Sequence, residues 1–172
     1  MKISISGYGE HGKDTLALMF KRVSTLEYTK STSAYVKTEM FQHMLSRGAT
    51  YKDEEECYAD RSNHREIWAE YIDIFNKDDP AALYRRCLKE QDILTGVRRR
   101  REFEAVMRLN VIDLAIWVHR PGQHFNDTTQ EYRDVDCDIT IINDTRPNML
   151  RKVRLLCKAL KILKCQHGNH VV

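Results

Sequence analysis

Gly7, Gly12 and Lys13, near the start of the chain, have the spacing G-x-x-x-x-G-K of a phosphate-binding loop. The glycines, with Gly9 between them, let backbone N–H groups converge on phosphate oxygens, and a helix that begins directly after the loop adds the positive end of its dipole. Lys13 can reach the β- and γ-phosphates and balance their charge during phosphoryl transfer. An incidental glycine turn is the alternative, but a loop between a strand and a helix favours binding of a nucleoside triphosphate.

Asp14 and Thr15 follow the lysine, at the point where the motif has a Ser or Thr that binds Mg²⁺. A carboxylate binds Mg²⁺ well, although it also repels a nearby triphosphate. Either Asp14 holds the metal, directly or through water, or Thr15 does. The sequence leaves both assignments open.

The loop lies between an expected strand and an expected helix. Residues 2–6 alternate apolar and polar types up to Gly7, and the apolar residues of 13–22 recur at helical spacing. Further strands are predicted at 92–97, 111–118 and 138–142, and further helices at 34–47, 52–58, 61–75, 79–89, 101–109 and 147–163. Strands that alternate with helices predict an α/β fold with a parallel sheet.

Composition narrows the class of protein. A chain of 172 residues has the size of one domain, and its 42% apolar and 31% charged residues are typical of a globular protein. The net charge of +3 does not indicate a strong nucleic-acid binder. No apolar run approaches the length of a membrane span, and the N-terminus does not resemble a signal peptide, so we expect a cytoplasmic protein.

The five cysteines show no C-x-x-C spacing, which predicts free thiols in a reducing compartment rather than disulfides or a zinc site. Cys165, His167 and His170 lie close together near the C-terminus and could suggest a metal cluster. Three potential ligands at a chain end are more typical of an unstructured tail, which is what we expect there.

Three segments resemble those of a known family. Residues 12–15 (Gly-Lys-Asp-Thr) resemble the variant loop of bacteriophage-type deoxynucleoside monophosphate kinases, a branch of the P-loop nucleoside monophosphate kinases. That family typically follows a buried strand with Asp-Val-Arg and, after three more residues, Glu. Here residues 96–98 (Gly-Val-Arg) and Glu102 stand in that register, and residues 141–144 (Ile-Ile-Asn-Asp) match the family's strand end before its last helix.

The resemblance implies a P-loop fold of three layers, with a central parallel sheet of about five strands in a single kinase domain over 1–172. The core would comprise residues 1–33 and 90–165. Residues 34–89 would form a helical insertion that binds the acceptor monophosphate, and residues 119–135 would form a loop similar to a lid.

Gly96 departs from the family pattern, because the family has an acidic residue at this strand end. Such an acid would help to position Mg²⁺ or the acceptor phosphate. Its replacement leaves Asp14 as the acidic metal contact. It also leaves open the alternative that the chain is a nucleotide-binding regulatory or scaffold protein that has lost turnover.

Four consecutive arginines, residues 98–101, form the densest basic run of the sequence. A solvated helix start is the ordinary interpretation, but four cations at a helix N-terminus oppose its dipole, so some of them should have anionic partners. The resemblance assigns Arg98 to catalysis. It places Glu102 among the residues that bind the substrate. Arg99, Arg100 and Arg101 are alternative candidates from the basic run, and of these Arg99 is assigned to the substrate.

Basic residues of the expected insertion are candidates for binding the acceptor phosphate: Lys37, Arg61, Arg65, Arg85 and Arg86. Arg61 and Arg65 stand four residues apart, so one helix face can present both. Ordinary helix surface is an equal alternative. Arg65 and Trp68 resemble the family's helix that lines the monophosphate site, and Trp68 could stack on a base, although aromatic residues at helical spacing are more often part of a core.

Arg120 and Arg133 flank the expected lid, and Arg120 is a candidate catalytic residue because closure of a lid over the phosphates excludes water. Asn143 and Asp144 either border the adenine of the nucleotide or cap the turn before Pro147.

The resemblance therefore implies transfer of the γ-phosphate of ATP, with Mg²⁺, to a deoxynucleoside 5′-monophosphate. It implies action in the cytoplasm, or in the host cytoplasm for a phage-encoded chain, without nucleic-acid or membrane partners, and it is compatible with a homodimer. A P-loop kinase of another small acceptor, such as dephospho-coenzyme A, remains the nearest alternative enzyme.

Overall fold

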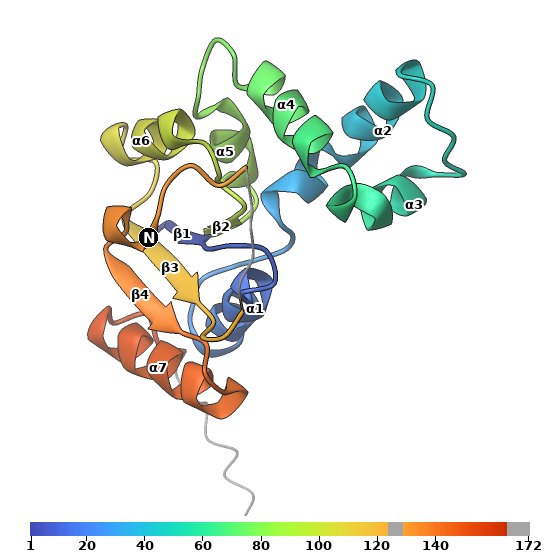
Figure 1. Cartoon of the computed structure of the whole chain (residues 1–172). Helices are drawn as coiled ribbons and strands as arrows, with labels where there is room; N and C mark the ends of the chain where they lie inside the picture. The colour runs from blue at the N-terminus through green and yellow to red at the C-terminus, as the bar shows by residue number, and fades with distance from the viewer. Residues whose placement is uncertain (124–128, 165–172) are drawn as a thin grey trace, which may run out of the picture.

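Four strands form one parallel sheet in the computed structural model, which describes residues 1–123 and 129–164 (Figure 1). They are β1 (Ile3–Ser6), β2 (Ile93–Thr95), β3 (Leu114–His119) and β4 (Ile139–Ile142), and their order in the sheet is β2-β1-β3-β4. The predicted α/β class and the parallel sheet are confirmed. Each pair is in parallel register, for example Ile5 with Thr95 of β2 and with Ile116 of β3.

The sheet has four strands in the described residues rather than the five or so that the resemblance implies. Residues 27–30 run past the start of β2, but they do not build a backbone ladder with it. Thr29 and Lys30 instead donate their N–H groups to the side-chain oxygen of Gln91, at 3.0 and 3.2 Å. One backbone bond joins the two segments, from the N–H of Asp92 to the carbonyl of Glu27 at 2.7 Å, and the side-chain amide of Gln91 satisfies Thr29 and Lys30.

The helices agree in order with the predicted ones: α1 (Lys13–Val23), α2 (Lys37–Ser46), α3 (Glu54–Ala59), α4 (Arg65–Phe75), α5 (Ala82–Cys87), α6 (Arg100–Arg108) and α7 (Arg146–Ala159). Short 3-10 turns are η1 (Thr32–Val36), η2 (Asp60–Ser62) and η3 (Asp134–Asp136). The last helix ends before the predicted residue 163, since Lys161 has a positive φ of 56° and Leu163 forms an antiparallel bridge with Ser24.

Helices cover both faces of the sheet because alternate strand residues point to opposite sides. Ile93, Ile116 and Val118 belong to the core that α1 and α7 cover. Leu94 and Trp117 belong to the second core, on the opposite face, where α5 and α6 pack. The sheet thus lies between two helical layers (Figure 1).

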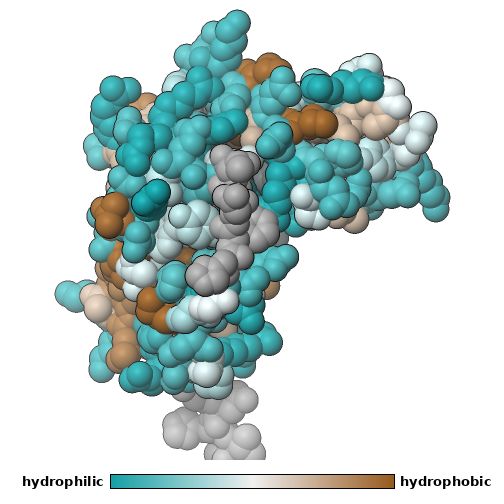
Figure 2. Space-filling view, viewed as in Figure 1, coloured by the Kyte–Doolittle hydropathy of each residue, from teal (hydrophilic) through white to brown (hydrophobic). Residues whose placement is uncertain are grey.

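The segment predicted as a helical insertion, 34–89, contains α2 to α5. Helices α2, α3 and α4 project from the sheet, and Figure 2 shows them overhanging the body of the molecule. Met40 and Trp68 pack among the buried residues of this part. Among the described residues, no helix is both long enough and apolar enough to cross a membrane.

The end of the expected lid is fastened to the core. Tyr132 is fully buried, and its hydroxyl donates to the carbonyl of Val97 at 3.0 Å and contacts Ser6. The N–H of Glu131 donates to the carbonyl of Arg98 at 3.0 Å. The middle of the expected lid, 124–128, and the tail with Cys165, His167 and His170 lie outside the described residues.

Candidate active site

The glycine-rich loop joins β1 to α1, and its backbone requires glycine at two motif positions. Gly7 has a φ of 145°, and a Cβ atom there would lie 2.5 Å from the carbonyl oxygen of Val118. Gly12 has a φ of 95°, and a Cβ atom there would lie 2.6 Å from Nδ2 of Asn143. Any side chain would therefore collide with the neighbouring strand β3 or with the residue that follows β4.

Lys13 is the first residue of α1, and its ammonium bends back over the loop. Its Nζ donates to the carbonyls of Gly7 and Tyr8 at 2.8 and 2.7 Å. These bonds hold a positive charge beside the N-terminus of a helix, where backbone N–H groups and the helix dipole also favour an anion.

His11 ties the loop to the residues that follow β3. The ring is 1% exposed, its Nδ1 accepts from the N–H of Arg120 at 3.3 Å, and its Nε2 lies 3.2 Å from the carbonyl oxygen of Gln123. A neutral ring with its proton on Nε2 satisfies both contacts, and burial lowers the pKa of His11 below 6.5. Asn143 fixes the same region, because its Nδ2 donates to the carbonyl of His11 at 3.0 Å.

Asp14, in the first turn of α1, contacts the end of β2. Its Oδ1 accepts from the hydroxyl of Tyr28 at 2.7 Å and from the hydroxyl of Thr95 at 2.9 Å. Burial, and then the negative charge of Asp14, raise the pKa of Tyr28 far above its usual value of 10. Tyr28 therefore remains a protonated donor to Asp14.

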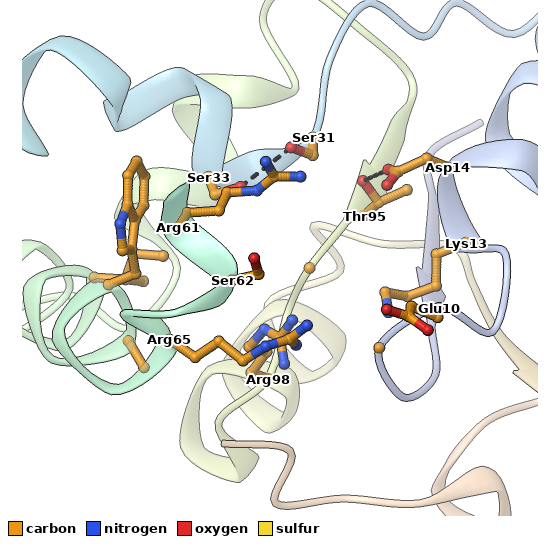
Figure 3. A pocket seen from close by; sticks show the side chains of 15 residues that line it. Glu10, Lys13, Asp14, Ser31, Ser33, Arg61, Ser62, Arg65, Thr95 and Arg98 are labelled. Atoms are coloured by element: carbon orange, nitrogen blue, oxygen red, sulfur yellow. Dashed lines mark hydrogen bonds between the residues drawn. The ribbon is translucent and has the colours of Figure 1, made fainter. Parts of the chain in front are cut away.

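A cavity of about 400 Å³ opens at the carboxyl ends of β1 and β2, between the glycine-rich loop and helix α4 (Figure 3). Its lining comprises Gly9, Glu10, Lys13, Asp14, Ser31, Ser33, Arg61, Ser62, Arg65, Trp68, Ala69, Ile72, Thr95, Gly96 and Arg98. The carboxyl ends of parallel strands are where α/β sheets generally bind ligands. We call Gly9, Glu10, Lys13 and Asp14 the loop wall, and Arg61, Arg65 and Arg98 the arginine wall.

Figure 3 shows the three side chains of the arginine wall extending from one side of the cavity, with Lys13 and Glu10 on the opposite side. Arg61 stacks over the ring of Tyr58, with its guanidinium carbon 4.1 Å from the ring centre, and donates to the Tyr58 carbonyl at 3.0 Å. Arg98 donates to the hydroxyl of Thr129 at 2.8 Å. These contacts orient the guanidinium groups of Arg61, from η2, and of Arg98, from the turn before α6; Arg65 comes from α4.

The side of the cavity that carries the arginine wall offers both apolar and polar surface. Trp68, Ala69 and Ile72 of α4 supply apolar surface at the arginine wall, whereas Ser31, Ser33 and Ser62 supply hydroxyl groups there. Hydroxyl groups, guanidinium groups and a patch of apolar surface suit a ligand that has both a charged group and a flat apolar ring.

The structure brings together some of the sequence-predicted site residues and leaves others outside the cavity. Gly9, Lys13, Asp14, Arg61, Arg65, Trp68 and Arg98 line it. Gly7, Gly12 and Asn143 do not line the cavity. They fix the backbone of the loop through the contacts described above. Thr15 and Arg120 do not line the cavity; Thr15 lies in the first turn of α1, and Arg120 is exposed after β3.

Two further residues predicted to bind the substrate have other partners. Lys37 forms ion pairs with Glu54 and Glu55 of α3, on the projecting helices. Arg99 forms ion pairs at 2.8 Å with Asp73 of α4 and Glu131. Neither of these side chains lines the cavity.

Glu102, also predicted to bind the substrate, is 1% exposed and lies in the interior. Its carboxylate accepts from Nδ2 of Asn76 at 2.8 Å and from the hydroxyl of Tyr84 at 2.5 Å. Burial raises its pKa above 4.5, against the opposing effect of these two donors. Glu102 thus joins α6 to α5 and to the end of α4.

Several lining residues escaped the sequence analysis: Glu10, Ser31, Ser33, Ser62, Ala69, Ile72 and Thr95. Glu10 lies inside the glycine motif and has a positive φ of 61°, so its place in the loop was the available signal. The serines have no motif spacing. Only the way the projecting helices fold over the sheet brings them to the cavity.

Among the described residues, no group of three or more His, Cys, Asp or Glu side chains could hold a metal ion. A metal at the loop wall would therefore complete its coordination with phosphate oxygens and water. That is the usual arrangement of Mg²⁺, which keeps several waters and takes one or two carboxylates.

No family model matches the chain, and no curated protein matches it. Among solved structures, the chain is similar to an unliganded sugar kinase from Janibacter sp. HTCC2649, at 16% identity over 94% of each chain with a TM-score of 0.47. At this identity and TM-score, the likeness carries no argument about activity.

Proposed function

We propose that the chain is an ATP-dependent phosphotransferase whose acceptor is a deoxynucleoside 5′-monophosphate. One observation carries the proposal. The lysine of a glycine-rich loop and three arginines line opposite walls of the same cavity. The choice of a deoxynucleotide follows from the family resemblance of residues 12–15, 96–102 and 141–144.

Phosphoryl transfer depends mainly on positioning and on the balance of charge. In the proposed reaction, the loop wall binds the triphosphate through backbone N–H groups and Lys13. Arg65 and Arg98 bind the acceptor phosphate, and the apolar surface of Trp68 and Ile72 contacts its base. The acceptor phosphate is already ionised at neutral pH, so the reaction needs no general base.

The residues of the loop wall fit a Mg²⁺ ion. Asp14 lines the cavity with a carboxylate, and Mg²⁺ prefers oxygen ligands. Asp14, with Thr15 as the alternative, would hold the ion. When bound, Mg²⁺ neutralises charge on the transferring phosphates.

A second candidate is a kinase of an acceptor hydroxyl, such as the hydroxyl of dephospho-coenzyme A. The observation in its favour is that two carboxylates, Glu10 and Asp14, line the cavity. A phosphate acceptor does not need a carboxylate as base, whereas a hydroxyl acceptor does. A regulatory protein without turnover would instead bind ATP and transfer nothing.

An assay of ADP release tests the three possibilities. ATP, Mg²⁺ and the chain are combined with each deoxynucleoside monophosphate, each ribonucleoside monophosphate and dephospho-coenzyme A in turn. We expect release that depends on at least one deoxynucleoside monophosphate. Release only with the hydroxyl acceptor would support the second candidate, and ATP binding without release in any mixture would support a regulatory protein.

A further inference from the structure

Three side-chain oxygens meet where the start of α1, the end of β2 and the segment after α1 come together. Oδ1 of Asp14 lies 2.7 Å from the hydroxyl of Tyr28 and 2.9 Å from the hydroxyl of Thr95, and the two hydroxyls lie 3.1 Å apart. Figure 3 shows the bond between Thr95 and Asp14 at the edge of the cavity. The three oxygens thus lie at the corners of a triangle. Because each hydroxyl has one proton, both hydroxyls donate to Asp14 and the contact between them carries no hydrogen bond of its own.

The triangle is buried on one side and open on the other. Tyr28 is 4% exposed and Thr95 is 1% exposed, whereas Asp14 is an exposed residue that lines the cavity. Buried hydroxyls must be hydrogen-bonded, and a carboxylate is the stronger type of acceptor. Both hydroxyls therefore hold the carboxylate in one orientation.

Both donors use the same carboxylate oxygen. Within residues 1–123 and 129–164, Oδ2 of Asp14 accepts no hydrogen bond from another side chain or from the backbone. The second oxygen is therefore available to a ligand in the cavity, at a fixed position beside Lys13.

The backbone at Gly96 explains why the carboxylate comes from α1. Gly96 follows Thr95 directly and has a φ of 103°, which residues with side chains rarely adopt. Space is not the constraint, since a Cβ atom there would lie 3.8 Å from the nearest atom, in Thr32. The backbone at the end of β2 thus disfavours an acidic residue at position 96. A carboxylate reaches this strand end from α1 instead, because Asp14 contacts Thr95, the residue before Gly96.

We propose that Tyr28 and Thr95 are positioning residues, which turn Oδ2 of Asp14 toward the cavity so that it binds the divalent cation of the nucleotide. This inference rests on the proposed function, because it requires a nucleotide at the loop wall. Partners that orient a metal ligand affect affinity for the metal strongly, although they do not touch it.

The test measures metal binding rather than turnover. Mn²⁺ is titrated into the chain with saturating ADP, and free Mn²⁺ is followed by electron paramagnetic resonance. ADP binding is measured separately by calorimetry in the presence of a chelator. Tyr28→Phe and Thr95→Val should each raise the Kd for Mn²⁺ about 10-fold. Asp14→Asn should raise it further, and neither Tyr28→Phe nor Thr95→Val should change the metal-free Kd for ADP by more than about two-fold.

Tyr51→Phe is the matched control. Tyr51 also donates to an aspartate, with its hydroxyl 2.9 Å from Oδ2 of Asp60, but neither residue lines the cavity. This variant should bind Mn²⁺ as the unaltered chain does. The thermal midpoint of every variant is recorded, so that loss of folding is distinguished from loss of metal binding.

Unchanged Mn²⁺ binding in folded Tyr28→Phe and Thr95→Val chains would overturn the inference and leave the proposed function intact. Loss of Mn²⁺ binding in Thr15→Val but not in Asp14→Asn would overturn it too, since Thr15 would then be the ligand. Failure of the unaltered chain to bind ADP would overturn the proposed function and this inference together.

Discussion

The glycine-rich loop that carries the loop wall is shaped by its main chain, whereas the arginine wall is formed by side chains. Gly7 and Gly12 have positive φ angles and no room for a Cβ atom, and Lys13 is held by two loop carbonyls. Arg61, Arg65 and Arg98 come from three separate segments, and side-chain contacts orient Arg61 over the ring of Tyr58 and Arg98 against Thr129.

The difference teaches which parts of such a site a short motif can specify. A main-chain site requires a few residues at fixed spacing, and that spacing is visible in the sequence. A side-chain site depends on which helix faces meet after folding. Arg98 and Arg99 illustrate this, because the first lines the cavity and the second pairs with Asp73 and Glu131.

The largest effect is expected from Lys13→Ala. This change removes the only lysine that lines the cavity among the described residues, so it should lower kcat for phosphoryl transfer about 10³-fold. Steady-state ADP release measures it, with circular dichroism to show that the fold is retained. A kcat within ten-fold of that of the unaltered chain would contradict a role of Lys13 in phosphoryl transfer.

Gly7→Ala tests whether the main chain of the glycine-rich loop is as constrained as its geometry indicates. The positive φ and the contact with Val118 together should lower the free energy of unfolding by about 2–5 kcal/mol. Gly48→Ala is the control, since Gly48 has a φ of 87° but a Cβ atom there would meet no other atom within 4 Å. It should cost about 1–2 kcal/mol. Equal losses in urea denaturation would contradict the steric argument.

Arg98→Ala tests the arginine wall. A hydrogen bond to a charged group contributes about 1.5–3 kcal/mol to binding. Its loss should therefore lower kcat/KM for the acceptor about 10- to 100-fold. Arg100→Ala is the control, because Arg100 is exposed and pairs with Asp136 outside the cavity. The kcat/KM of the Arg100→Ala variant should stay within about two-fold of that of the unaltered chain. A larger loss in the Arg100 variant would place the acceptor elsewhere.

Glu102→Gln should give the smallest effect, and only on stability. Because burial raises the pKa of Glu102 above 4.5, the folded chain binds this proton more tightly than the unfolded chain does. The contribution of Glu102 to stability is therefore greatest below its unfolded pKa, and it declines as pH rises through the raised value. Glutamine does not titrate, so the variant should lack this decline in urea midpoints measured from about pH 4 to about pH 8.

Glu104→Gln, on the exposed side of the same helix, is the control for that prediction. The decline that Glu102 contributes should persist in this variant. If Glu102→Gln also retained the full dependence, the decline would have to come from other groups.

Sequence periodicity predicted most of the fold. Each of the four predicted strands and each predicted helix has a counterpart, with ends that differ by a few residues. The differences arise from contacts distant in sequence. Leu163 pairs with Ser24 instead of continuing α7, and the N–H groups of residues 29–30 bond to the side chain of Gln91. The sheet has four strands among the described residues.

The site was predictable only in part. Lys13, Asp14, Arg61, Arg65 and Arg98 were named from the sequence and line the cavity. Ser31, Ser33 and Thr95 were not, because no spacing marks a residue that tertiary packing brings to a cavity. Glu102 is in register with the family motif, yet its carboxylate is buried against Tyr84.

The central claim is that the two walls bind two different ligands in one cavity. Isothermal titration calorimetry tests it directly, with ADP titrated first and a deoxynucleoside monophosphate second. One molecule of each should bind per chain, Lys13→Ala should weaken only ADP, and Arg98→Ala should weaken only the monophosphate. Competition between the two ligands for one place, or equal loss of ADP binding in the Arg98 variant, would contradict the claim.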